Sequence, residues 1–271
     1  MSTQVIATLS DLKRALQTPG WIDTVQDQGA WLPRIVEAIS WQTQLSKHFV
    51  LHFFEVTPEP TGTVFPNFLT RAEEIYHELQ VFFEIAPQTK TENLIEEGRL
   101  TLFIIHTRSD RTFGGLTDPH LLFYLMDTQS DRSVMTRLRH ELAHWVWGRR
   151  FGEAPRLWQE GVAVYAEQDS EPGGPGIRAT ALCKATPLID AAPRIEELVV
   201  NDRFWQNDGA YTIAGSWIAF LVQQHGWGPL KQLFLHSDYE DQNSLGVFEA
   251  VYGTRLESAE TLWRNALRSC G

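Results

Sequence analysis

The residues best suited to chemistry in this chain lie within one five-residue stretch, His140-Glu141-Leu142-Ala143-His144. On an α-helix, residues i and i+4 project side by side, so both imidazoles would lie on one face with a carboxylate beside them. Zinc binds nitrogen and oxygen donors that converge from fixed directions, and this spacing supplies two of three protein ligands from a single helix. The stretch matches the His-Glu-x-x-His signature of zinc hydrolases, in which the third ligand comes from elsewhere.

The third zinc ligand is predicted to be Glu160. Fifteen residues lie between His144 and Glu160, which is enough for one helix to end, the chain to reverse and a second helix to return. A lone carboxylate between Trp158 and Val162 requires a partner, and a metal ion would provide one. The alternative for Glu160 is an exposed carboxylate favoured by the dipole at a helix start, and the alternative for the histidines is ordinary capping or packing.

Two helices must position these residues. Asp131 or Ser133 can begin the first helix, and Gly148 with Gly152 can end it. The residues between them include an apolar stripe at helical spacing, formed by Val134, Leu138, Leu142 and Trp145. After a turn that contains Pro155, residues 157–167 have the pattern of a second helix with Glu160 near its start. Upstream, the patterns predict strands at 47–55, 100–106 and 121–127 and a helix at 65–83, and several helices follow downstream.

Taken together, these segments resemble the gluzincin metallopeptidases, and most closely their small peptidase MA-like branch, which is related to thermolysin and aminopeptidase N. The specific part of the resemblance is the first motif followed by Leu157-Trp-Gln-Glu-Gly-Val-Ala-Val-Tyr165. It implies an α+β, zincin-like fold over residues 47–268, with the active-site cleft between two lobes. A mixed strand and helix lobe with the zinc helix would span 47–150, and a helical lobe 151–268. Residues 1–46 would form a helical extension in front.

The resemblance also implies roles for individual residues. Zn²⁺ held by His140, His144 and Glu160 would keep an open position for water, and Glu141 would act as the general base. In aminopeptidase N-like relatives a downstream tyrosine stabilises the oxyanion, and Tyr211 is the candidate here. Tyr165 is the competing candidate, and a buried packing role is the alternative for Tyr211. Thermolysin-like members carry an Asp four residues beyond the third ligand, where this chain has Val164.

Three further segments could border the cleft through which a substrate would enter. In zincins a strand such as 121–127 lies along the cleft as an edge, so an extended peptide would pair with it. The loop 109–120 would then form one rim of the cleft. The Pro- and Gly-rich segment 169–176 is either a mobile lid or a plain surface connection.

Composition limits the remaining function classes. The chain has 271 residues, 43% hydrophobic and 21% charged, which suits one large domain or two apposed lobes. A formal charge of -11 disfavours nucleic acid and anionic membranes as partners. No signal peptide or long apolar stretch is visible, so a cytoplasmic location is expected. Cys183 and Cys270 are too few for a disulfide framework, and free thiols are expected.

The sequence therefore predicts a zinc metallopeptidase that cleaves peptide or protein substrates. The absence of a Gly-x-Met-x-Asn type segment before the zinc helix favours an endopeptidase or the processing of one particular polypeptide. The alternatives are a non-catalytic zinc-binding or scaffold protein on the same fold and a zinc hydrolase with a non-peptide substrate. The oligomeric state stays open.

Overall fold

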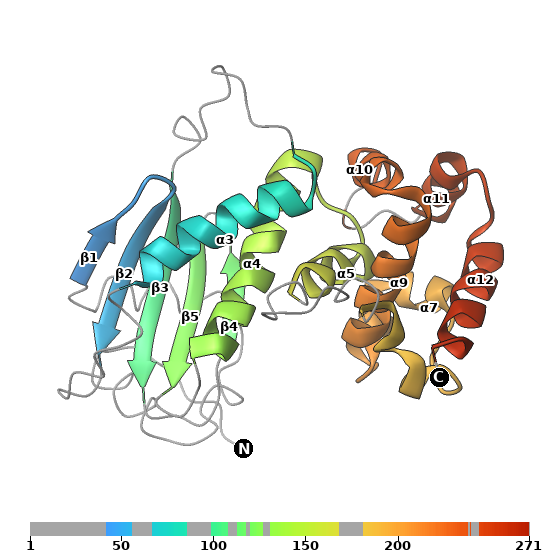
Figure 1. Cartoon of the computed structure of the whole chain (residues 1–271), viewed down its shortest axis with the longest axis horizontal. Coiled ribbons are helices and arrows are strands. Elements are labelled where there is room, and N and C mark those ends of the chain that lie inside the picture. The colour runs from blue at the N-terminus through green and yellow to red at the C-terminus, as the bar shows by residue number, and fades with distance from the viewer. Residues whose placement is uncertain are drawn as a thin grey trace. The chain divides into compact units, whose positions relative to one another are not determined.

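The computed structural model describes residues 42–55, 67–85, 99–107, 113–117, 120–126, 131–167, 181–237, 239 and 244–270. Our predictions for the extension over residues 1–41 and for the segment 169–176 lie outside these residues. The described part is a mixed α+β protein in which helices predominate (Figure 1). In chain order its elements are β1 (Gln42–Leu45), β2 (Phe49–Glu55), α3 (Phe68–Phe82), β3 (Leu100–Thr107), β4 (Phe113–Thr117), β5 (His120–Met126), α4 (Asp131–Phe151), α5 (Arg156–Glu167), η3 (Thr186–Leu188), α7 (Ile195–Val199), α8 (Asn201–Trp205), α9 (Ala210–His225), α10 (Trp227–Leu235), α11 (Ser244–Tyr252) and α12 (Leu256–Arg268).

The described strands form a five-stranded sheet in the order β1-β2-β3-β5-β4. The three central strands run parallel, and β1 and β4 pair antiparallel at the two sides. Leu51 of β2 is paired with Leu102 of β3, and both side chains are completely buried. Strands β2, β3 and β5 correspond to the three predicted strands. Residues 42–45, which we had assigned to the helical extension, instead form β1 and belong to the sheet.

Strand β5 lies inside the sheet, so our expectation that residues 121–127 form an edge is wrong. Phe123 is paired with Ile104 of β3 on one side and with Gly114 of β4 on the other. The edge strand on this side of the described sheet is β4, which lies within the segment expected to be a loop. Glycines are depleted in strands, which is why Gly114 and Gly115 favoured a loop, but here both are paired with β5.

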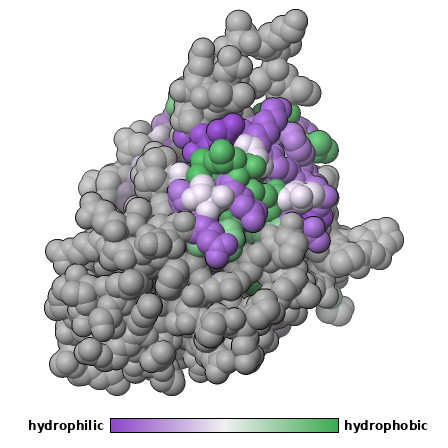
Figure 2. Space-filling model, turned by 90° about the vertical axis from the view of Figure 1, so that its left-hand side faces the viewer, coloured by the Kyte–Doolittle hydropathy of each residue, from purple (hydrophilic) through white to green (hydrophobic). Residues whose placement is uncertain are grey.

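Helix α3 packs against the sheet through an apolar face at helical spacing. Phe68, Ala72, Ile75 and Tyr76 are buried, and the ring of Tyr76 lies edge-on to that of Phe49 with centroids 6.2 Å apart. Figure 1 shows this helix running across the strands. Figure 2, which views the molecule from the side where β1 lies in Figure 1, shows hydrophilic and hydrophobic residues mixed within the described part of that surface.

The described residues divide into two compact units, and the boundary crosses helices α3 and α4. The first unit contains the sheet, α3 as far as His77 and α4 as far as Glu141. The second unit contains the rest of the two helices, from Glu78 and from Leu142, and all later helices. The predicted boundary between the two lobes, after residue 150, lies near the end of α4 and thus several residues beyond the boundary at Glu141.

The second unit has an aromatic core. Trp147 is fully enclosed, and its ring centroid lies 5.0 Å from that of Phe83 and 5.3 Å from those of Trp227 and Phe234. Helix α5 is buried on most of its surface and packs against α9. Rings of this size remove much apolar area from water, which stabilises the unit. None of the described helices combines the length and the apolar content needed to cross a membrane.

The two cysteines form a disulfide, so our expectation of free thiols is wrong. Cys183 and Cys270 are bonded, with their Cα atoms 5.7 Å apart and a separation of 87 positions in sequence. The number of cysteines could not reveal this pairing, because it depends on helix α12 returning Cys270 to the segment that carries Cys183.

Candidate metal site

Helix α4 carries the two histidines of the motif on successive turns. His140 is 3% exposed, the side chain of His144 is 13% exposed, and Glu141 between them is 5% exposed. The helix begins at Asp131, one of the two residues predicted to start it, and continues past Gly148 to Phe151. It ends at Gly152, which has a φ of +83° and donates its backbone N–H to the carbonyl of Gly148. Glycine adopts this left-handed conformation without steric strain, so Gly152 provides the helix end.

Helix α5 brings Glu160 to the same place. The turn before it contains Pro155, whose carbonyl accepts the N–H of Trp158 and begins the helical bonding. Glu160 lies in the second turn and is only 4% exposed. The ligand atoms of His140, His144 and Glu160 all lie within 4.8 Å of one another. The structure therefore brings together the three residues that the sequence singled out as metal ligands.

The distances in this group suit a metal ion. Nε2 of His144 lies 3.2 Å from Oε2 of Glu160. Zinc bonds to histidine nitrogen and carboxylate oxygen are about 2.0–2.2 Å, so two such ligands of a tetrahedral ion are about 3.3 Å apart. Two imidazoles and one carboxylate are also a donor set that zinc favours. Small side-chain movements would bring all three residues onto a shared ion.

Arg156 holds the second oxygen of Glu160. Its Nη1 donates a hydrogen bond of 3.1 Å to Oε1, one helical turn farther along α5. Burial by itself would lower the pKa of Arg156, but Tyr239 and Glu160 raise it, so the guanidinium stays charged. Because Arg156 engages Oε1, the other oxygen of Glu160 is left facing His144. This arrangement is typical of the outer groups that orient metal ligands.

Arg156 is itself fixed by groups from two other segments, helix α8 and the segment that carries Tyr239. Its Nε donates to the hydroxyl of Tyr239 at 2.8 Å, and its backbone N–H donates to Oδ1 of Asn201. The guanidinium lies over the rings of Trp205 and Tyr239, at 4.9 and 5.1 Å from their centroids. Cation–π contacts of this kind restrict where the guanidinium can go.

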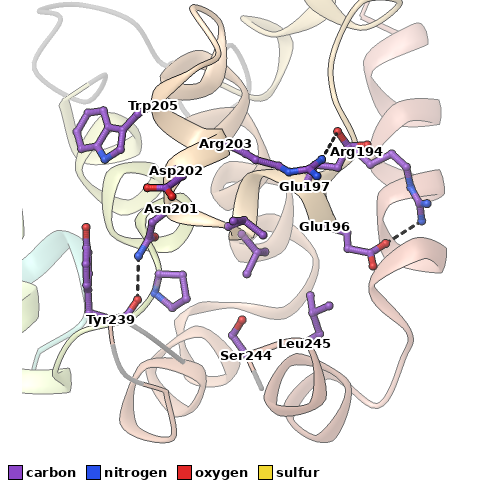
Figure 3. Close-up of a pocket in the computed structure, with 13 residues that line it drawn as sticks. Arg194, Glu196, Glu197, Asn201, Asp202, Arg203, Trp205, Tyr239, Ser244 and Leu245 are labelled. Atoms are coloured by element: carbon purple, nitrogen blue, oxygen red, sulfur yellow. Dashed lines mark hydrogen bonds and ion pairs between the residues drawn. The ribbon is translucent and has the colours of Figure 1, made fainter. Parts of the chain in front are cut away.

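The groups that fix Arg156 also line a pocket of about 650 Å³ in the second unit. Figure 3 shows the amide of Asn201 bonded to the backbone of Tyr239, with Trp205 farther along the same wall. Among the other lining residues Arg194 pairs with Glu196, and Arg203 of α8 pairs with Glu197 (Figure 3). The pocket is therefore connected to Glu160 through one residue, Arg156.

The tyrosines expected near the oxyanion lie in different surroundings. Tyr165 is 2% exposed and packs in the aromatic core, with ring centroids 5.3 Å from Phe82 and 5.8 Å from Trp227. Tyr211 is 36% exposed on the first turn of α9, and its ring contacts Trp205 at 6.1 Å. Tyr211 is thus the more accessible of the two phenols, on the side where Trp205 covers Arg156.

Sequence reasoning missed Arg156 and Tyr239. Arg156 stands four residues before Glu160 on a helix, and this spacing places opposite charges side by side, so the pair could have been found. Tyr239 is 83 positions from Arg156, and no local pattern connects them. Val164, at the position of the Asp in thermolysin-like enzymes, is a buried apolar residue.

Comparisons with known proteins give no family for this chain. No protein-family model matches it, and a search of curated proteins found no match either. The resemblance to gluzincins therefore depends on the sequence motifs alone.

Proposed function

We propose that this protein is a zinc-dependent metallopeptidase of the gluzincin type with a zincin-like fold. The observation that supports it most is the convergence of His140, His144 and Glu160 from two helices to within 4.8 Å. Three protein ligands of these types are usual in catalytic zinc sites, where a fourth position stays open. Glu141 adds a buried carboxylate on the same helix. A purely structural zinc site would use four protein ligands and would not need Glu141.

The residues would divide the reaction between them. Zinc bound here would polarise the substrate carbonyl and lower the pKa of water. Glu141 would accept a proton from the attacking water and donate it to the departing amine of the peptide. Arg156 would keep Glu160 in its ligand orientation through the bond to Oε1. An uncharged peptide bond is a poor electrophile, and in this proposal the metal would activate it while the carboxylate would activate the water.

The test separates metal binding from catalysis with two variants. Zinc content is measured by elemental analysis, and cleavage is measured on a peptide library with product identification by mass spectrometry. We expect Glu141→Gln to keep the zinc content of the unaltered protein but to lose cleavage by about 10²- to 10⁴-fold, because only the base is removed. We expect His144→Ala to contain one equivalent of zinc less and to be inactive.

Other outcomes would point to the competing functions. If the protein is a scaffold, neither the unaltered protein nor Glu141→Gln would hydrolyse any peptide. If the protein is a hydrolase with a non-peptide substrate, His144→Ala would still contain one equivalent of zinc less. The unaltered protein would then cleave no peptide, either in the library or in a native lysate. Equal zinc content in the unaltered protein and His144→Ala would contradict the metal site itself.

A further inference from the structure

A second group of metal-binding side chains lies in the first unit, well apart in sequence from the first group. His48, Glu73 and His77 place one ligand atom each within 4.8 Å of one another. We propose that they form a second site for a divalent transition metal, which fastens the turn between β1 and β2 to helix α3. This site does not depend on the proposed peptidase activity.

Two of the three ligands are already held in place. Nδ1 of His48 lies 2.6 Å from Oε2 of Glu73, and the backbone N–H of His48 donates to Oε1 at 2.8 Å. The imidazole is 7% exposed and packs on the ring of Tyr76, with centroids 4.4 Å apart. The turn is closed by the bond from the N–H of Ser46 to the carbonyl of Phe49. Ligands fixed in this way lose little freedom when an ion binds.

The third ligand stands at the open side of the group. His77 follows Glu73 by four residues on α3, so both side chains project from the same face of the helix. Its ring lies edge-on to that of His48, with centroids 5.6 Å apart, and it is exposed to solvent. An ion can therefore reach the group from water and meet two imidazoles and one carboxylate.

The donor set indicates which ions would bind. Two nitrogens and one carboxylate suit Zn²⁺, Co²⁺, Ni²⁺ or Cu²⁺, whereas Mg²⁺ and Ca²⁺ prefer oxygen ligands. Burial by itself would raise the pKa of Glu73, but neighbouring side chains and the hydrogen bonds with His48 lower it, so the carboxylate is ionised at neutral pH. Binding must displace the proton between His48 and Glu73 and widen their 2.6 Å separation toward the ~3.3 Å of zinc ligands.

A latch without metal is the competing explanation. The bonds from His48 to Glu73 would by themselves hold the turn to the helix, and in that case His77 would bind no ion. The two explanations therefore differ in what the removal of His77 does. His77 is exposed, and its ring contacts those of His48 and Tyr76, so its replacement by Ala removes a surface imidazole but neither partner of the His48–Glu73 bonds.

The experiment measures Zn²⁺ binding by isothermal titration calorimetry on the full chain after chelator treatment. His144→Ala is the background, because it removes a ligand of the first group. We expect about one equivalent of Zn²⁺ to bind with proton release, visible as a heat that depends on the buffer. Adding His77→Ala should abolish this binding or weaken it at least tenfold. The matched control His236→Ala, an exposed histidine on another helix end, should leave the Kd within twofold.

A second measurement uses the unaltered protein, so that it does not depend on the folding of any variant. On titration with Zn²⁺, the imidazole NMR signals of His48 and His77 should shift together. The proposal is overturned if the His144→Ala background binds no Zn²⁺, if His77→Ala leaves the affinity unchanged, or if the two imidazoles do not respond together.

Discussion

Gly161 lies so close to Ala214 that a Cβ built on residue 161 would be 2.8 Å from the carbonyl oxygen of Ala214. The same Cβ would be 2.6 Å from Cγ1 of Ile218. Both separations are shorter than atomic contacts allow, so α5 and α9 approach this closely only because residue 161 has no side chain. Since Gly161 directly follows Glu160, the contact also determines where Glu160 sits relative to α9.

Gly161→Ala should therefore destabilise the protein despite the better helix propensity of alanine. Overpacking costs about 1–3 kcal/mol, which exceeds the ~1 kcal/mol that alanine gains over glycine in a helix. Urea unfolding should show the loss, and zinc affinity should fall because Glu160 moves with α5. Gly148→Ala is the matched control: nothing lies within 4 Å of its Cβ position, so it should be neutral or stabilising. Equal stability of the two variants would show that the helices can separate freely.

Arg156→Met should weaken metal binding without removing a ligand. Methionine keeps much of the apolar length of the side chain but leaves Oε1 of Glu160 without its donor. Loss of an outer group that orients a ligand usually lowers metal affinity about 10- to 100-fold. Competition with a chromophoric chelator measures this change. The control Arg255→Met removes an arginine whose side chain is 76% exposed, and it should leave the metal affinity unchanged. A similar loss of metal affinity in both variants would mean that only the overall charge of the protein matters.

The proposed role of Tyr211 as oxyanion donor can be tested with one variant and one control at Tyr239. If Tyr211 supplies it, Tyr211→Phe should lower kcat about 10²- to 10³-fold and leave KM nearly unchanged, because the interaction exists only in the transition state. Tyr239→Phe removes the hydroxyl that accepts the bond from Arg156 and should act on zinc affinity instead. Steady-state kinetics and zinc titration of both variants decide the question, and an unaltered kcat in Tyr211→Phe would exclude its catalytic role.

Stability at alkaline pH should depend on Tyr252. Its hydroxyl is enclosed, has no hydrogen-bond partner among the described residues, and its pKa is raised by burial above the ordinary 10.0. Above about pH 10 the unfolded chain loses a proton that the folded chain keeps, so the free energy of unfolding falls as pH rises. Below pH 10 this effect is absent.

Tyr252→Phe removes both the enclosed hydroxyl and its titration. At pH 8 the variant should be as stable as the unaltered protein or more stable by about 1 kcal/mol, because an unpaired buried hydroxyl is unfavourable. Between pH 10 and 11 its stability should decline less steeply. Denaturant unfolding at several pH values measures both effects, and parallel declines would show that Tyr252 ionises equally easily in the folded chain.

Reduction of the disulfide between Cys183 and Cys270 should destabilise the second unit. A crosslink that closes a long loop restricts the unfolded chain and typically contributes about 2–4 kcal/mol. Unfolding with and without dithiothreitol measures the loss, and the double variant Cys183→Ser with Cys270→Ser should be insensitive to the reductant. Two reactive thiols in the native, unreduced protein would contradict the bond.

The elements that carry the site were predictable because their patterns are local. The apolar stripe of α4 and the apolar surface of α5 lie within one helix each, and both helices occur where these patterns predict them. His140, His144 and Glu160 could be grouped because a two-helix return is the simplest path for a short connection. Their role as zinc ligands stays a prediction.

What could not be predicted depends on residues far apart in sequence. Strand β4 contains two adjacent glycines and exists as a strand because β5 pairs with it. The bond from Arg156 to Tyr239 and the bond between Cys183 and Cys270 each connect segments more than 80 positions apart. Such contacts follow from tertiary packing, which no short sequence pattern encodes.

The disulfide also makes residues 183–270 a closed covalent ring, and this ring contains Asn201, Trp205 and Tyr239. A protease that cut the backbone once inside it would leave both fragments attached to each other. A nicked molecule would keep the groups that hold Arg156 tethered to the rest of the unit, and it would migrate as a single chain on a gel until it was reduced.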